Sequence, residues 1–539
     1  MRPDATSSQA EAVAAHARLV RALCDPACFP DPVARVEAIE THISSVLLTG
    51  AFAYKLKKPL DLGFLDFTTL EKRRFCCEEE VRLNRRTAPS IYLDVVPVTG
   101  TLARPKIGGA GPVLDYAVRM RQFGADQTFD ALLARGELTG ERIDQLAACV
   151  AAFHATIAVA EASHPFGTPE RVWRAARENF LQIEPFVEAA ALRESLAGLR
   201  AWSEAEFARL RPVLEARRAD GFVRECHGDL HLRNVALIDG QPVPFDCIEF
   251  NADLRWIDVA SEIAFAVMDL LAHGASPLAW RFLNAYLEAT GDYACLQALR
   301  FYLAYRSMVR AKVAAIRSRQ ADATAAERAH AAGELEHYVA LAATPGKPAM
   351  PALIVMTGLS GSGKTRLAGS LAQQLGAIRI RSDVERKRLH GVAAQARTGA
   401  GIETGLYASE ASAKTYARLA ELARAVLASG FPVIADAAFL RRADRDALRS
   451  IARRANARFV LVACEAPLEV LRQRIAARER GGNDASEATV AVLERQIATR
   501  EPLAPEELAE AIVCDASRPD ASQAAAKKIA GQLAPGVLP

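Results

Sequence analysis

The sequence predicts a multidomain protein in which an α+β part precedes an α/β part. Its 539 residues exceed what one hydrophobic core usually organises. β-rich and helical stretches fill the first part, whereas short apolar strands alternate regularly with helices after residue 351. Between them, residues 344–351 (TPGKPAMP) have the proline and glycine content of a linker. We therefore predict one domain over 1–343 and a second over 352–539.

The first domain is predicted to have two lobes. From about 36 to 123 the pattern is β-rich, with two strands around Thr49-Gly50, a helix at 69–86 and a further alternating strand in VLDYAVRMRQF. From 124 to 343 the periodicity is mostly helical, and a β-like island at 222–250 interrupts it.

The second domain is predicted to contain a buried parallel sheet. Its strands read as continuous apolar runs, which indicates that helices cover both faces of the sheet. The predicted strands are 352–357, 377–380, 431–435, 459–464 and 511–514, and the intervening helices include 364–375 and 408–429.

Composition and charge exclude several classes of protein. A formal charge of +3 is close to neutral for this length and gives no global nucleic-acid footprint. No signal-peptide core and no apolar run of membrane-spanning length is present. The ten cysteines show no zinc-binding spacing, so we expect reduced thiols in a cytoplasmic protein.

A phosphate-binding loop connects the first strand and helix of the second domain. Residues 358–365 (GLSGSGKT) match GxxxxGK[ST] without deviation. The glycines let backbone amides turn toward phosphates beside a positive helix N-terminus. Lys364 can reach the β/γ oxygens and Thr365 can ligate Mg²⁺. The other residues expected at the nucleotide are Gly358, Ser360, Gly361, Ser362 and Gly363.

Three further residues of this domain are candidates for phosphate transfer. Asp383 follows a predicted strand and opens a helix that carries Arg386. Ligands of open α/β sheets bind beyond the carboxyl ends of strands, so Asp383 could orient and deprotonate an acceptor hydroxyl while Arg386 clamps a phosphate. Alternatively, Asp383 only caps its helix. Asp436 ends the strand FPVIAD and is a candidate Mg²⁺ carboxylate, although it could equally contact the acceptor.

An arginine-rich helix precedes a GGN turn in the same domain. Its arginines are Arg472, Arg474, Arg478 and Arg480. A mobile lid that delivers arginine to a transferring phosphate has this pattern, and Arg474 and Arg478 are the predicted catalytic pair. A solvated basic face is the alternative.

Residues 352–515 resemble the small P-loop kinases grouped around zeta toxins, polynucleotide 5′-kinases, gluconate kinase and chloramphenicol phosphotransferase. The phosphate-binding loop, the S-D-x-x-R segment and the arginine-rich lid carry this resemblance. It implies a P-loop NTPase fold and phosphorylation of a hydroxyl on a small molecule or polynucleotide, with Asp383 as base.

The island at 222–250 has the pattern of a kinase catalytic loop. His227-Gly228-Asp229 is followed by Asn234, by a short hairpin and by Asp246. In this arrangement Asp229 accepts the hydroxyl proton, whereas Asn234 and Asp246 hold the metal ions.

A kinase-type first lobe also needs a lysine for the α/β-phosphates. Lys55 and Lys57 share one face of a predicted strand, so both are candidates and we favour Lys55. We expect Glu79, within a run of three glutamates, to pair with it. His154 is predicted to be a core histidine, and Asp258 and Glu262 either anchor the catalytic loop or line the acceptor cleft.

HGDLHLRN and Asp246 resemble the signature of the aminoglycoside phosphotransferase and choline kinase family over about 40–340. The tandem order resembles bacterial bifunctional aminoglycoside phosphotransferase/ATP-binding proteins. The resemblance implies a bilobal protein-kinase-like fold followed by a P-loop domain, with ATP and Mg²⁺ at both sites and a small-molecule hydroxyl as acceptor. Two alternatives remain open: one module is a nucleotide-sensing regulator, or the protein is a polynucleotide or RNA end kinase.

Overall fold

The computed structural model describes residues 5–63, 65–320, 323–346, 351–393, 409–481, 488–518 and 520–533. Contacts divide the chain into two compact units. The first comprises Met1–Trp173 and Leu214–Ala266, and the second comprises Arg174–Val213 and Val267–Pro539. The predicted linker at 344–351 stays a prediction; by contacts, the helices just before it group with the sheet that follows it.

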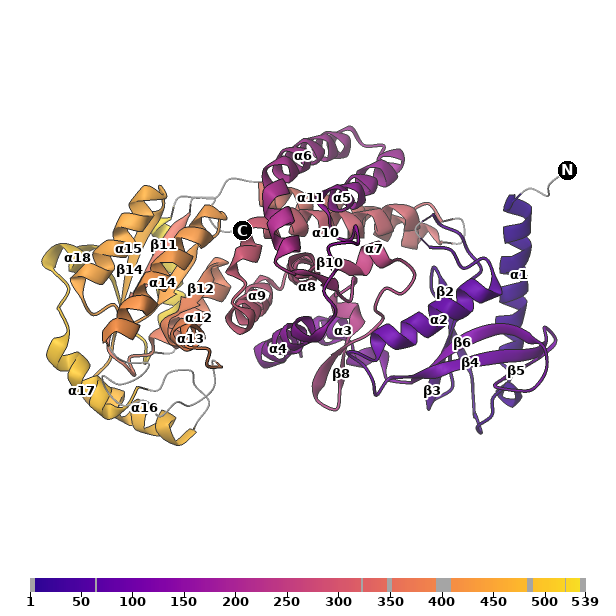
Figure 1. The fold of residues 1–539 in the computed structure, drawn as a ribbon, viewed down its shortest axis with the longest axis horizontal. Helices are drawn as coiled ribbons and strands as arrows, with labels where there is room; N and C mark the ends of the chain where they lie inside the picture. Colours follow the sequence, from indigo (N-terminus) through magenta and orange to yellow (C-terminus); the bar gives the residue numbers. More distant parts are fainter. Residues whose placement is uncertain are drawn as a thin grey trace. The chain divides into compact units, whose positions relative to one another are not determined.

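A six-stranded antiparallel sheet forms the start of the first unit (Figure 1), in the order β1-β2-β3-β6-β4-β5. The predicted strands around Thr49-Gly50 are present, and so is the strand in VLDYAVRMRQF, but β1, β4 and β5 were not anticipated. Many positions of β4 are half-buried, which weakens the alternation that reveals a strand in sequence. The strands are β1 (Glu37–Glu40), β2 (Ser44–Leu48), β3 (Phe52–Lys57), β4 (Tyr92–Thr101), β5 (Arg104–Ile107) and β6 (Val113–Arg121).

The two faces of this sheet are covered by different helices. On β3, Tyr54 and Leu56 share a core with α1 (Ala5–Leu23). The alternate side chains, Lys55 and Lys57, point to the face on which α2 (Leu70–Asn84) packs. The helix predicted at 69–86 is therefore α2, and it carries the partners of both lysines.

Short strands and loops hold the predicted catalytic island. β7 (Val223–Glu225) pairs with β10 (Trp256–Asp258), and β8 (Val235–Ile238) forms a hairpin with β9 (Gln241–Pro244). The surrounding helices are α3 (Phe129–Ala134), α4 (Gly140–Thr156), α7 (Ala252–Arg255) and α8 (Val259–Ala272), the last of which continues into the second unit. α5 (Pro169–Ile183) and α6 (Ala190–Ala219) also contribute to both units.

A five-stranded parallel sheet organises the second unit, in the order β12-β13-β11-β14-β15. All six residues of β11 are buried, which confirms a sheet covered on both faces. α12 (Lys364–Leu375) and α19 (Ala521–Gln532) share one apolar core with β11. The strands are β11 (Ala352–Thr357), β12 (Ile378–Arg381), β13 (Val433–Asp436), β14 (Arg458–Glu465) and β15 (Ile512–Asp515). The predicted α+β and α/β fold class is thus confirmed.

Helices on either side of the predicted linker complete the second unit. Those before it are α9 (Ser276–Thr290), α10 (Leu296–Arg317) and α11 (Ala325–Ala343). Those after it, besides α12 and α19, are α13 (Ser382–Leu389), α14 (Ser409–Ala428), α15 (Arg442–Arg454), α16 (Leu468–Gly481), α17 (Val490–Thr499) and α18 (Pro505–Glu510). Across the described ranges, no helix combines the length and apolar character needed to cross a bilayer.

α9 packs against the outer strand of the parallel sheet. The Asn284 side chain donates to the Ala377 carbonyl at 3.0 Å and accepts from the Arg379 amide at 2.6 Å. Trp280 packs against the turn at Gly376, where a β-carbon would lie only 3.0 Å from the indole ring. These buried contacts join α9 to β12 and to α12, the helix that follows the phosphate-binding loop.

Candidate active sites

In the first unit, two lysines converge on one buried glutamate. The Lys55 ammonium lies 2.8 Å from Glu80 Oε1 and 2.5 Å from Asp246 Oδ1, and the Lys57 ammonium lies 2.5 Å from Glu80 Oε2. Lys57 also contacts Glu249 and is fully buried. Burial alone would raise the pKa of Glu80, but the two ammonium groups lower it to about 2. Lys55, which reaches the predicted metal aspartate and is partly exposed, is the better placed of the two to meet a nucleotide.

The prediction that Glu79 pairs with these lysines is wrong. Glu79 lies one residue from Glu80 and therefore on another face of α2, where it binds Arg82 and Arg255. Glu80 shares the buried face with Cys77 and Asn84. That spacing of three and four residues is the signal that could have identified it.

Hydrogen bonds link the side chains of the predicted catalytic loop at 227–234 to one another and to the neighbouring backbone. His227 Nε2 lies 2.8 Å from the Phe245 carbonyl, and its Nδ1 accepts from the Asp229 amide at 3.3 Å. Burial lowers the pKa of His227, so this ring is neutral and orients the loop. The Asn234 amide donates to Asp229 Oδ2 at 2.9 Å, and His231 Nε2 lies 3.3 Å from the same oxygen.

Asp246 has a backbone conformation that few residues other than glycine adopt. Its φ is +64°, and its amide donates to the Tyr92 hydroxyl at 3.1 Å. Asp246 and Asp229 side chains are 41% and 33% exposed, so both carboxylates face solvent. The oxygen-rich set of Asp246, Asn234 and Asp229 fits the ligand preference of Mg²⁺. Local strain of this kind is common at functional positions.

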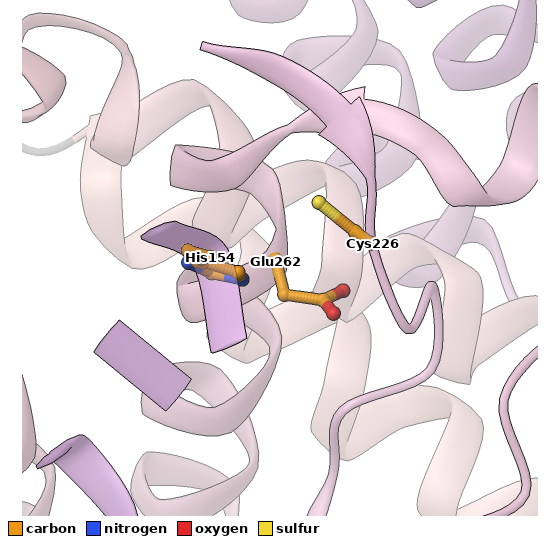
Figure 2. A group of neighbouring side chains, drawn as sticks. All are labelled: His154, Cys226 and Glu262. Carbon is orange, nitrogen blue, oxygen red and sulfur yellow. The ribbon is translucent and has the colours of Figure 1, made fainter. Parts of the chain in front are cut away.

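Glu262, on α8, anchors the catalytic loop rather than lining an acceptor cleft. Its two carboxylate oxygens accept from the His227 amide at 2.6 Å and from the Gly228 amide at 3.0 Å. Figure 2 shows Glu262 with His154 and Cys226. A ring nitrogen of His154, the Cys226 sulfur and a Glu262 carboxylate oxygen lie within 4.8 Å of one another, as the ligand atoms of a metal site would. Because both Glu262 oxygens already accept backbone hydrogen bonds, we interpret this cluster as structural. His154 is 3% exposed, as expected of a core histidine, and Asp258 forms a buried pair with Arg217.

In the second unit, the phosphate-binding loop has the geometry that its sequence predicts. Gly358, Gly361 and Gly363 all have positive φ angles. A β-carbon on Gly358 would lie 2.3 Å from the Cys464 carbonyl oxygen, so the close approach of β14 requires glycine. Lys364 Nζ donates to the Leu359 carbonyl at 2.8 Å, which folds the side chain back over the loop.

A cavity of about 780 Å³ opens beside this loop. Asp383, Arg386 and Asp436 all line it, together with Ser360, Gly361, Gly363, Lys364 and Thr365. Arg386 Nη1 lies 3.0 Å from Asp383 Oδ1, so the predicted base and clamp form an ion pair. Ser362 lies next to the cavity-lining residues, and its hydroxyl is buried.

The pair of Thr365 and Asp436 fits a magnesium site. Thr365 Oγ1 donates to Asp436 Oδ1 at 3.3 Å, and the other carboxylate oxygen of Asp436 is buried without a hydrogen bond. Burial raises the pKa of Asp436, while Arg379, Arg381 and Lys364 oppose that rise. A divalent cation would satisfy the buried oxygen.

The arginine-rich helix is α16, and its arginines differ in position. Arg474 lines the cavity and donates to the Gly361 carbonyl at 3.2 Å. Arg472 instead pairs with Glu469 and Glu494 on the exposed side, as the alternative of a basic face expects. The side chains of Arg478 and Arg480 lie outside the described residues.

Sequence reasoning missed several residues that line the same cavity. Arg381 ends β12, Tyr416 lies on α14, and Arg441 and Asp444 lie at the start of α15. Burial raises the pKa of Tyr416 to about 12, so its hydroxyl stays protonated and can donate. The position of Arg381 just before Ser382-Asp383 was the available signal, since it lies at the carboxyl end of a strand.

Parts of this chain are similar to known proteins. A family model described as an AAA domain matches residues 353–503, which include the phosphate-binding loop, Asp383 and Asp436. A solved sugar kinase from Janibacter sp. HTCC2649 is 25% identical and covers 35% of this chain and 99% of its own, with a TM-score of 0.26. A solved choline kinase from Cryptosporidium parvum Iowa II is 11% identical and covers 60% of this chain and 94% of its own, with a TM-score of 0.36.

A similar protein that matches most of the chain comes from a mycobacterium. The uncharacterized protein Rv2004c of Mycobacterium tuberculosis (strain ATCC 25618 / H37Rv) is 30% identical over 473 residues, which are 87% of this chain and 92% of that protein. This chain therefore belongs to the same family as the mycobacterial protein Rv2004c.

Proposed function

We propose that the protein is an ATP-dependent phosphotransferase with two kinase modules, each of which transfers the γ-phosphate to a hydroxyl group of a small molecule. One observation carries the proposal: each unit places a candidate base beside its own set of phosphate and metal ligands. Asp229 lies with Asn234 in a loop anchored near Asp246 and Lys55, and Asp383 shares a cavity with Lys364 and Asp436. ATP and Mg²⁺ are the proposed cofactors at both sites.

In the first module, the residues of the chain orient the acceptor. Asn234 and His231 hold Asp229 Oδ2, which fixes the plane of the carboxylate that receives the hydroxyl proton. Lys55 would bind the α/β-phosphates while Glu80 keeps its ammonium in place. Mg²⁺, bound by Asn234 and Asp246, would neutralise charge on the phosphates.

In the second module, the glycine loop and Lys364 would hold the phosphates and Arg474 would stabilise charge on the transferring group. Asp383 would receive the acceptor proton, and Thr365 and Asp436 would hold Mg²⁺. Among the described residues that line the cavity, seven are cationic and three are carboxylates. This excess of positive charge supports the binding of a strongly anionic ligand such as a nucleoside triphosphate.

The ten cysteines are free thiols, most of them buried. This supports our proposal of a reducing, cytoplasmic location.

The test uses single substitutions in the full-length protein. Asp229→Asn and Asp383→Asn keep the size of each side chain but cannot take a proton, so transfer should fall by about 10² or more while nucleotide binding persists. A metabolite extract is incubated with γ-labelled ATP, and the labelled products are separated by anion exchange. Each variant should lose a different product, and Asp220→Asn, at an exposed position, should lose none.

Two results would contradict the proposal. Loss of every product from either single variant, with nucleotide still bound at both sites, would indicate one catalyst and one nucleotide sensor. Label that appears only on added RNA or DNA ends would replace the small-molecule acceptor with a polynucleotide.

A further inference from the structure

A glutamate far from the phosphate-binding loop in sequence holds two arginines of the P-loop site. Glu288 lies on α9, and its side chain is 15% exposed. Its Oε1 accepts from Arg379 Nε at 2.9 Å, and its Oε2 lies 3.2 Å from Arg381 Nη1. Both arginines belong to β12, so one carboxylate spans two successive outward-facing positions of this edge strand.

Each arginine also approaches one residue of the pair that fits a magnesium site, Thr365 or Asp436. Arg379 Nη1 donates to the Thr365 carbonyl at 3.3 Å. Arg381 Nε lies 3.9 Å from Asp436 Oδ2, which is outside hydrogen-bonding distance. Thr365 and Asp436 are themselves hydrogen bonded, so Glu288 is connected to both residues through one intervening side chain each.

The distance between Arg381 and Asp436 matters because an arginine and a metal ion compete for the same carboxylate. A guanidinium in direct contact with a buried carboxylate forms a strong charge-assisted pair. Asp436 is 4% exposed, so water screens such a pair poorly. With Arg381 bound to Glu288, the buried Oδ2 of Asp436 has no hydrogen-bond partner among the described residues.

We propose that Glu288 is a positioning residue of the P-loop site, which restrains Arg381 so that Asp436 remains available to a divalent cation. This inference rests on the proposed function of that site. It also assigns a role in the second module to a helix that the sequence places in the first predicted domain.

The test measures metal dependence of nucleotide binding rather than turnover. A fluorescent, non-hydrolysable ATP analogue is titrated with Mg²⁺ in the full-length protein, and the component of binding that Lys364→Ala abolishes is taken as the P-loop site. Glu288→Gln should raise the Mg²⁺ concentration at half-saturation by about tenfold, which lies within the usual range for coupling between linked sites. Glu336→Gln, an exposed glutamate of α11, is the matched control and should change nothing.

A second substitution separates positioning from damage to the fold. If the released Arg381 is what competes with the metal, Glu288→Gln combined with Arg381→Gln should bind Mg²⁺ at the wild-type concentration or below it. If Glu288→Gln does not fold, Glu288→Asp, which keeps the charge on a shorter side chain, is judged by the same shift and the same rescue.

The possible outcomes are distinct. Wild-type binding without any component sensitive to Lys364→Ala would defeat the proposed function itself. A sensitive component whose Mg²⁺ dependence is the same in the wild type and in Glu288→Gln would overturn the role of Glu288 and leave the function standing. A shift that persists undiminished in the Arg381→Gln background would also overturn it, because Arg381 would then not be the competing group.

Discussion

The anchoring of the catalytic loop by Glu262 leads to a quantitative expectation for Glu262→Gln. The substitution keeps the shape of the side chain but leaves only one oxygen for two backbone donors, the amides of His227 and Gly228. One hydrogen bond loses its charged acceptor, and the other amide faces an NH₂ group. Weakening the first bond and leaving the second donor unsatisfied together cost about 2–4 kcal/mol.

The effect should be local, so native-state hydrogen exchange read by mass spectrometry is the suitable assay. A cost of about 2–4 kcal/mol corresponds to roughly 30- to 1,000-fold faster exchange through local opening. We expect this acceleration in peptides spanning 223–235 and much less in the sheet of β1–β6. Glu11→Gln, at an exposed position of α1, is the control for loss of a glutamate charge. Unchanged exchange at 223–235 in a folded Glu262→Gln protein would refute the anchoring role.

Two other predictions follow from burial and from close backbone contacts. Burial lowers the pKa of His154 to about 3. Below pH 6.5 the unfolded chain therefore binds a proton that the folded chain does not. The free energy of unfolding should fall by about 2 kcal/mol between pH 7 and pH 5. Measured by urea unfolding, the free energy of unfolding should depend less on pH in His154→Gln than in the wild type, whereas the exposed control His330→Gln should keep the wild-type dependence. The same pH dependence in His154→Gln and the wild type would contradict this. Gly358→Ala should abolish nucleotide binding at the P-loop site. Gly333→Ala, with open space around it, should leave nucleotide binding unchanged and should keep or raise the melting temperature, when both variants are measured by nucleotide titration and thermal melting.

The parts of the sites that sequence predicts are those that a short segment encodes. The phosphate-binding loop needs only eight consecutive residues and the strand and helix beside them, so its placement followed from the sequence. The segment from His227 to Asp246 is similarly local. The strand before the phosphate-binding loop was predicted at 352–357, which are the bounds of β11. The strand that ends at Asp436 was predicted within two residues of β13.

The parts that sequence did not predict depend on which face of an element is buried, or on pairing across long separations. Three adjacent glutamates are equivalent in composition, and only the packing of α2 distinguishes Glu80 from Glu79. Glu249 pairs with Lys57 across 192 positions, and Glu288 with Arg379 across 91. Buried and exposed positions do not alternate regularly along β4, so the sequence did not reveal this strand, which supplies Tyr92 to the first site.

The contact of Asn284 with β12 has a consequence for truncated forms of the protein. An edge strand with unpaired amide and carbonyl groups is a template for association with other chains. The Asn284 side chain occupies one such amide and one such carbonyl, and Trp280 shields the turn beside them. A fragment that begins at residue 351 would lose this cover and present a bare parallel edge. Such a fragment should self-associate through β12 as its concentration rises, whereas the full-length chain, in which α9 covers this edge, should not associate through it.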